Sequence, residues 1–121
     1  MATFPLSPED RPPDAITDLD AVLRRQLELS TRKHFFEACD GFTQSLLMEC
    51  GWTINIAEVL MLVIHCPDPI TNWRVLNRIG AIARLLAQFS PNAKIRVYPP
   101  PDTGGPFDMR VDEESEYHDQ R

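Results

Sequence analysis

The residues most able to do chemistry lie in the stretch LVIHCPDPITNW, residues 62–73. An apolar run stops at His65 and Cys66, two prolines bracket Asp68, and a helical pattern follows. Many α/β enzymes place a nucleophile where a strand ends and a helix begins. The stretch is therefore a candidate site for cysteine- or histidine-dependent catalysis.

A phosphatase loop does not fit this stretch. Cysteine-dependent phosphatases follow a His-Cys pair with five loop residues and an arginine, so that loop amides surround the phosphate. Here the corresponding position is Asn72, and the nearest arginine is Arg74. Pro67 and Pro69 have no amide hydrogen to donate, so an anion cradle cannot form.

A His–Cys nucleophile pair is also disfavoured. Neighbouring residues on a strand point to opposite faces, so His65 cannot readily activate Cys66. We favour a strand end with one side chain buried and the other near the rim. The alternative, a small cytosolic enzyme with a site near these two residues, requires Cys66 in an exposed, electropositive setting.

Other sites are equally poorly supported. The histidines and cysteines show no ligand pair at a familiar metal spacing. Gly104 and Gly105 lie between prolines with no helix after them, unlike a phosphate-binding loop. We therefore predict a non-enzymatic protein with no metal and no cofactor.

The elements that position these residues fit into one domain, because the chain has only 121 residues. Residues 1–14 are rich in proline, and residues 113–121 are mostly charged or polar, so both are predicted to be disordered tails. Residues 15–112 are predicted to form a single α/β domain.

The first predicted element is a helix over about 18–30, capped by Thr17 and ending near Ser30. Its apolar stripe consists of Leu19, Val22, Leu23 and Leu27, while Arg24, Arg25 and Glu28 face elsewhere. Residues 31–50 are ambiguous. We favour a helix, a turn at Asp40–Gly41 and a strand over 42–49, and a continued helical stripe is the alternative.

Alternation at Trp52, Ile54 and Ile56 leads into an apolar run over 59–64. This pattern predicts a central strand covered on both faces, although a buried helix is the alternative. Thr71 is expected to cap a helix over about 71–89, which is followed by strands over 93–98 and 107–112. The fold class is thus α/β (α+β), a small mixed sheet of three to four strands with a βαβ crossover helix. The last strand is predicted to be an edge.

The net charge narrows the classes of partner that the protein is expected to bind. A net charge of −6 disfavours nucleic acid and anionic membrane surfaces. No apolar run is long enough to span a bilayer, no secretion signal is visible, and the three cysteines form no CxxC pair. These features predict a cytoplasmic protein with reduced thiols.

Function is then expected on the surface. Trp73, Arg74 and Arg78 form a basic, aromatic-edged helix face. We favour a solvated face, and a docking face is the alternative, since tryptophan and arginine are favoured binding anchors. Tyr98 precedes a PPPD segment that we favour as a stiff connector between two strands, with polyproline docking as the alternative. The strand with Phe107 and Met109 offers an edge for an added peptide strand. We predict a protein-binding adaptor or assembly factor for a larger complex. A homodimer is compatible with so small a sheet, because a second copy could cover its remaining hydrophobic surface.

One resemblance supports this prediction. A proline-rich acidic start, one compact core and the segment YPPPDTGGPF before an acidic end resemble small cyanobacterial accessory proteins. Among these, the chain is similar to the CcmS family of carboxysome assembly factors. The resemblance implies a non-enzymatic assembly role, associated with carboxysomes, in which a shell-protein tail is the partner. It assigns no binding residues.

Overall fold

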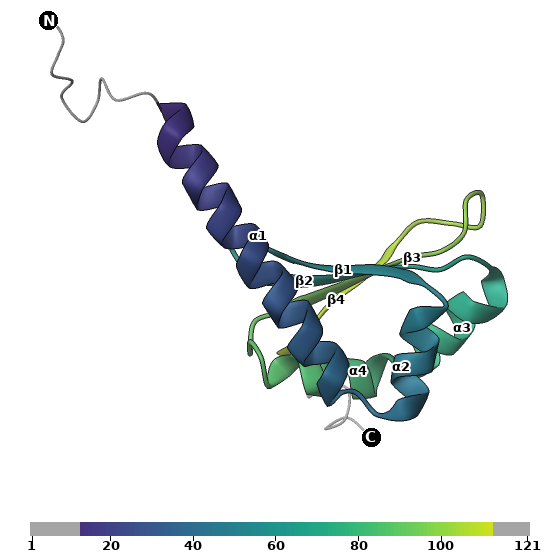
Figure 1. Ribbon diagram of the computed structural model, residues 1–121. Helices are drawn as coiled ribbons and strands as arrows, with labels where there is room; N and C mark the ends of the chain where they lie inside the picture. Colours follow the sequence, from purple (N-terminus) through teal and green to yellow (C-terminus); the bar gives the residue numbers. More distant parts are fainter. Residues whose placement is uncertain (1–12, 113–121) are drawn as a thin grey trace, which may run out of the picture.

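The computed structural model describes residues 13–112 and shows an α+β fold (Figure 1). The elements are α1 Pro13–Ala38, α2 Gly41–Met48, β1 Gly51–Ile56, β2 Leu60–His65, α3 Pro69–Asn77, α4 Ile79–Ala87, β3 Lys94–Tyr98 and β4 Phe107–Arg110. The predicted tails lie largely outside the described residues, while Pro13 and Asp14 are the first residues of α1.

The sheet has four strands in the order β1-β2-β3-β4. The β1–β2 and β3–β4 pairs are antiparallel, and β2 runs parallel to β3. The α3 and α4 helices form the crossover between β2 and β3, which confirms the predicted βαβ unit and mixed sheet. The predicted edge position of β4 is confirmed as well.

The core fills the space between the sheet and the helices, which gather on one of its sides (Figure 1). Alternation places the even-numbered residues of β1 and β2 and the odd-numbered residues of β3 in this core. Its largest fully buried side chains come from every layer: Phe35, Leu46, Leu47, Ile54, Leu62, Ile64, Ile82, Leu86 and Ile95.

The second face of β2 is less covered than the sequence predicted. Met61 is only half-buried and His65 is exposed, whereas Val63 is buried without joining the core cluster. The central position of the strand is confirmed, but the prediction of cover on both faces is wrong. Both parities of β2 are apolar although helices pack on one side only.

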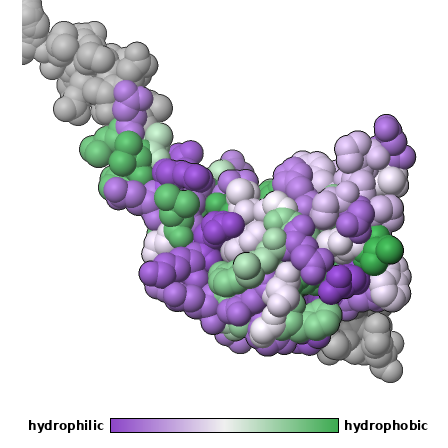
Figure 2. Space-filling view, turned by 45° about the vertical axis from the view of Figure 1, so that its right-hand side comes forward, coloured by the Kyte–Doolittle hydropathy of each residue, from purple (hydrophilic) through white to green (hydrophobic). Residues whose placement is uncertain are grey.

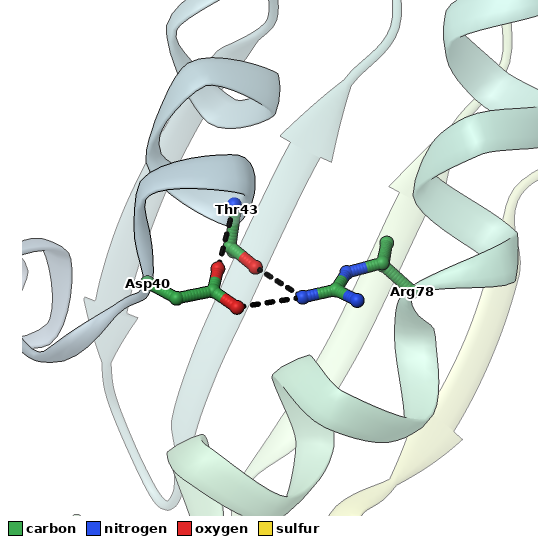
Figure 3. Close-up of polar contacts among 3 residues, drawn as sticks. All are labelled: Asp40, Thr43 and Arg78. Atoms are coloured by element: carbon green, nitrogen blue, oxygen red, sulfur yellow. Dashed lines mark hydrogen bonds and ion pairs between the residues drawn. The ribbon is translucent and has the colours of Figure 1, made fainter.

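The predicted strand over 42–49 is wrong, because this segment is α2. Asp40 is the N-cap, and its carboxylate accepts a hydrogen bond of 2.8 Å from the amide of Thr43 (Figure 3). Asp-Gly favours turns, but aspartate is an equally good N-cap, so the dipeptide fits both structures. Burial of Thr43, Leu46 and Leu47 follows the helical spacing.

The boundaries of two other helices also differ from the prediction. The first helix begins at Pro13, so Thr17 lies inside it and is not its N-cap, and the helix continues past Ser30 to Ala38. The crossover is two helices, because the backbone leaves helical geometry at Arg78, with φ −101° and ψ 4°. Its cap is Asp68 rather than Thr71: the Asp68 carboxylate accepts a 2.7 Å hydrogen bond from the Thr71 amide. Pro69 then fills the first helical turn, where proline is favoured.

Phe35 ties α1 to the rest of the core, since its ring contacts Trp52 and Phe89 at centroid distances of 6.1 and 5.8 Å. The substitution Phe35→Ala should lower the free energy of unfolding by about 3–5 kcal/mol, because it leaves a cavity at a fully buried site. Denaturant unfolding measures the loss. The control is Met48→Ala, since Met48 is 74% exposed. Equal stability of the two variants would contradict the packing.

The two capping carboxylates predict acid sensitivity. Hydrogen bonds from Thr43 lower the pKa of Asp40, and hydrogen bonds from Thr71 lower the pKa of Asp68. The unfolded chain therefore binds protons at higher pH than the native protein. The stabilisation is complete above the ordinary aspartate pKa of about 3.9 and disappears as the pH falls through the lower native values.

The double variant Asp40→Asn/Asp68→Asn keeps a cap acceptor at both sites but removes the titrating groups. Its free energy of unfolding should change less than that of the wild type between neutral and strongly acidic pH. Chemical unfolding curves at a series of pH values measure this difference. Parallel pH profiles would show that the caps contribute nothing to acid sensitivity.

Candidate protein-docking surface

The predicted His65–Cys66 site does not assemble. The ring of His65 is exposed and stacks on Tyr98 at a centroid distance of 4.7 Å and an interplanar angle of 5°. Cys66 is buried in the core, and its amide donates a hydrogen bond of 2.9 Å to the Tyr98 carbonyl. The imidazole is thus engaged on the open face of the sheet, while the thiol belongs to the helix-covered side.

The thiol environment favours packing over nucleophilic chemistry. Burial raises the pKa of Cys66, and it raises the pKa of Cys50 to about 12 and that of Cys39 to about 11. The neighbouring Cys66 thiol adds to the rise in the pKa of Cys50. A nucleophile needs thiolate, and these thiols stay protonated at neutral pH.

The predicted helix face of Trp73, Arg74 and Arg78 is only partly free. Arg78 lies 2.9 Å from the Asp40 carboxylate and 3.3 Å from the Thr43 hydroxyl (Figure 3). Arg74 pairs with Glu49 at 3.3 Å. Both arginines therefore join α3 to α2, and Trp73, at 67% exposed, is the member left for a partner.

The last predicted surface residues divide between core and surface. Met109 is buried in the core cluster, so its side chain is not a docking group. Phe107 is 40% exposed, and Tyr98 is half-buried under its contact with His65. The PPPD segment closes a turn in which the Pro100 carbonyl accepts a 2.6 Å hydrogen bond from the Thr103 hydroxyl. Among the residues that the structure describes, the outer edge of β4 has no pairing strand.

Sequence reasoning found the apolar stripe of α1 but did not place it on the surface. This helix continues beyond the sheet as a projecting arm (Figure 1). We name the four apolar residues along this arm the outward stripe: Leu19, Val22, Leu23 and Leu27, between 53 and 61% exposed. Figure 2 shows hydrophobic side chains on the arm among hydrophilic ones.

A different face of α1 holds the helix to β1. The Glu28 carboxylate accepts a hydrogen bond of 2.7 Å from the Ile56 amide, and the Arg32 guanidinium donates to the Trp52 carbonyl at 3.4 Å. These backbone groups lie on β1, an edge strand of the sheet. Phe36 stacks on Trp52 with ring centroids 6.0 Å apart. Polar and aromatic side chains, not leucines, thus join the helix to the sheet.

The outward stripe points away from this attachment. Glu28 lies nine positions after Leu19, and Arg32 lies nine positions after Leu23. Nine positions are about two and a half helical turns. Leu19 therefore lies on the side of the helix opposite Glu28, and Leu23 lies opposite Arg32. The sequence signal was present: the stripe of Leu19 and Leu23 is half a turn out of phase with Glu28, Arg32 and Phe35.

No family model, no curated protein and no solved structure matches the chain. The resemblance to carboxysome assembly factors therefore stays a prediction. Among the residues that the structure describes, no helix is long and apolar enough to cross a membrane. Within the same residues, no group of histidine, cysteine and carboxylate side chains is arranged to hold a metal ion.

The buried thiols give a direct prediction. In the native protein, Cys39 and Cys66 should react with a maleimide much more slowly than in the unfolded chain, because both are buried and their pKa is raised. Mass spectrometry of peptides after timed labelling measures each site. The labelling rate of Cys50, which is half-buried, is the internal comparison for the rates of the two buried thiols. Rapid native labelling of Cys66 alone would instead support a reactive site.

Proposed function

We propose that the protein is a non-catalytic interaction module, an adaptor or assembly factor that binds a partner protein through the outward stripe of α1. The observation that carries this proposal is the stripe itself: four contiguous aliphatic side chains more than half exposed, on an arm whose opposite face is attached to the domain. Contiguous apolar surface of this kind is typical of protein-binding sites.

Energetics favour an occupied stripe. Complete burial of a leucine or valine contributes about 1.5–3 kcal/mol. Because each of the four side chains is about half exposed, a partner surface would recover about 4 kcal/mol from this side of the contact. The partner is expected to present an apolar helix, since an amphipathic helix fits a stripe with this spacing.

The alternative, a small enzyme that uses His65 or Cys66, has less support. A catalytic pair needs the two side chains within hydrogen-bonding reach and a thiolate at neutral pH. The raised pKa of Cys66 and the stacking of His65 on Tyr98 oppose both requirements. The carboxysome resemblance adds a specific version of the adaptor, in which the partner is a shell-protein tail and the protein acts in the cytoplasm.

The experiment compares two double variants as affinity baits in a native lysate. Leu19→Glu/Leu23→Glu places two charges on the outward stripe, and Met48→Glu/Ile70→Glu places two on α2 and α3. All four substituted side chains are between 55 and 74% exposed, so neither pair of substitutions disturbs the core. We expect the stripe variant to lose stoichiometric partners at least about tenfold, because charge in a desolvated contact is costly. The control should retain them.

Circular dichroism and thermal unfolding establish that both variants keep the fold. Loss of partners from Met48→Glu/Ile70→Glu, with retention by the stripe variant, would move the docking site to the α2–α3 surface around Trp73. Unchanged capture by both would contradict a role for either surface. Lost activity in a stable Cys66→Ser variant would favour the enzyme.

A further inference from the structure

We propose that the helix that covers the outward stripe is the same stripe of a second copy, packed antiparallel about a two-fold axis near Val22. This inference rests on the proposed function and names the partner of that site. It follows from the charges on the flanks of the stripe, which discriminate between the two possible helix directions.

The acidic and basic residues of the arm are separated along its length. Asp18 and Asp20 come first, and Arg24 and Arg25 follow within two turns. Asp18 and Arg25 are seven residues apart, about two turns, so they share one flank of the stripe, where Arg25 also lies 3.8 Å from the Glu28 carboxylate of its own chain. Asp20 and Arg24 are four residues apart and share the other flank, where they form an ion pair of 2.9 Å within the chain.

In an antiparallel pair related by a two-fold axis, each flank of the stripe meets the same flank of the second copy, which runs in the opposite direction. Asp18 then lies near Arg25 of the second copy, and Asp20 lies near Arg24 of the second copy. Each flank therefore joins acidic residues to basic ones, and the symmetry repeats both contacts. Opposite charges beside an apolar seam are the pattern that specifies helix pairing.

A parallel pair has the opposite consequence. Its two-fold axis runs along the helices, so the flank with Asp18 and Arg25 meets the flank of the second copy that carries Asp20 and Arg24. Residues with similar numbers then lie side by side. Asp18 would then face Asp20 of the second copy, and Arg25 would face Arg24. Repulsion at both ends opposes this arrangement, and it leaves the antiparallel pair as the one that the charges favour.

The apolar residues suit the same arrangement. With the axis near Val22, this side chain meets its own copy, and Leu19 and Leu23 interleave on either side of it. The helix backbone continues to Pro13, so the second helix extends past Leu27. Because the arm projects beyond the sheet (Figure 1), the two folded domains would stand at opposite ends of the helix pair.

Such a dimer would present the open β4 edge twice, once in each copy. A repeated partner could then be held at two points, and simultaneous binding raises the overall affinity without new contacts. This bivalency is how a self-pairing arm would serve an assembly factor.

The first experiment measures the mass of the full chain in solution by analytical ultracentrifugation over a concentration series. The wild type is expected to dimerise in the micromolar range, and Leu19→Glu/Leu23→Glu is expected to stay monomeric. Met48→Glu/Ile70→Glu is the matched control and should dimerise as the wild type does. Dimerisation of the stripe variant with unchanged affinity would overturn the proposal.

The second experiment tests the direction by exchanging charges. Asp18→Arg/Asp20→Arg should raise the dimer Kd at least about tenfold, because arginines then face Arg24 and Arg25 across the seam. Adding Arg24→Asp/Arg25→Asp restores complementary flanks and should restore the affinity. A parallel pair predicts no such loss and rescue, since like residues already face each other. Circular dichroism checks that each variant keeps the helix.

The results separate this inference from the proposed function. A wild type that stays monomeric at high concentration, while the stripe variant still loses its lysate partner, overturns the self-pairing and leaves the docking site intact. A monomeric wild type whose stripe variant captures partners normally contradicts both.

Discussion

The attachment of α1 to Trp52 determines which face of this helix contacts the domain and which face is exposed. The Arg32 guanidinium lies 4.0 Å above the Trp52 ring, Phe35 and Phe36 contact the same ring, and the Trp52 carbonyl accepts from Arg32. Together these contacts fix the rotation of the helix about its axis. Once that rotation is fixed, Glu28 must meet the edge of β1, and Leu19 and Leu23 must face away from the domain.

This constraint also accounts for how the two sheet edges differ. Edge strands are prone to pair with other chains, and covering an edge with a helix is one protection. On β1, Glu28 and Arg32 bind backbone groups of the strand. β4 carries charged side chains, among them Asp108, which pairs with Arg96 at 2.6 Å. Within residues 13–112, the surfaces left for association include the outward stripe, the exposed part of α3 and the short β4 edge.

The sequence contained enough to predict the βαβ unit, because an apolar strand, a capped amphipathic segment and a second alternating strand each have a distinct period. It did not distinguish the Asp40 cap from a turn, since the same two residues suit both. It marked Trp73 and Arg78 as a surface pair, yet Arg78 is held by Asp40, a contact between residues 38 positions apart. Long-range pairing of this kind has no local signal.

The same limit applied to α1, where the sequence marked a regular apolar stripe but not the direction in which it faces. The contacts of Arg32 and Phe35 with Trp52 turn the stripe outward, because packing decides which of two competing faces of a helix is buried.

The central claim, that the outward stripe is covered by another copy of α1, is tested most directly by hydrogen–deuterium exchange of the α1 amides at several protein concentrations. Residues 19–29 should become more protected from exchange as the protein concentration rises, while the exchange of β2 and β3 should not change. Protection of residues 19–29 that is independent of concentration would contradict it.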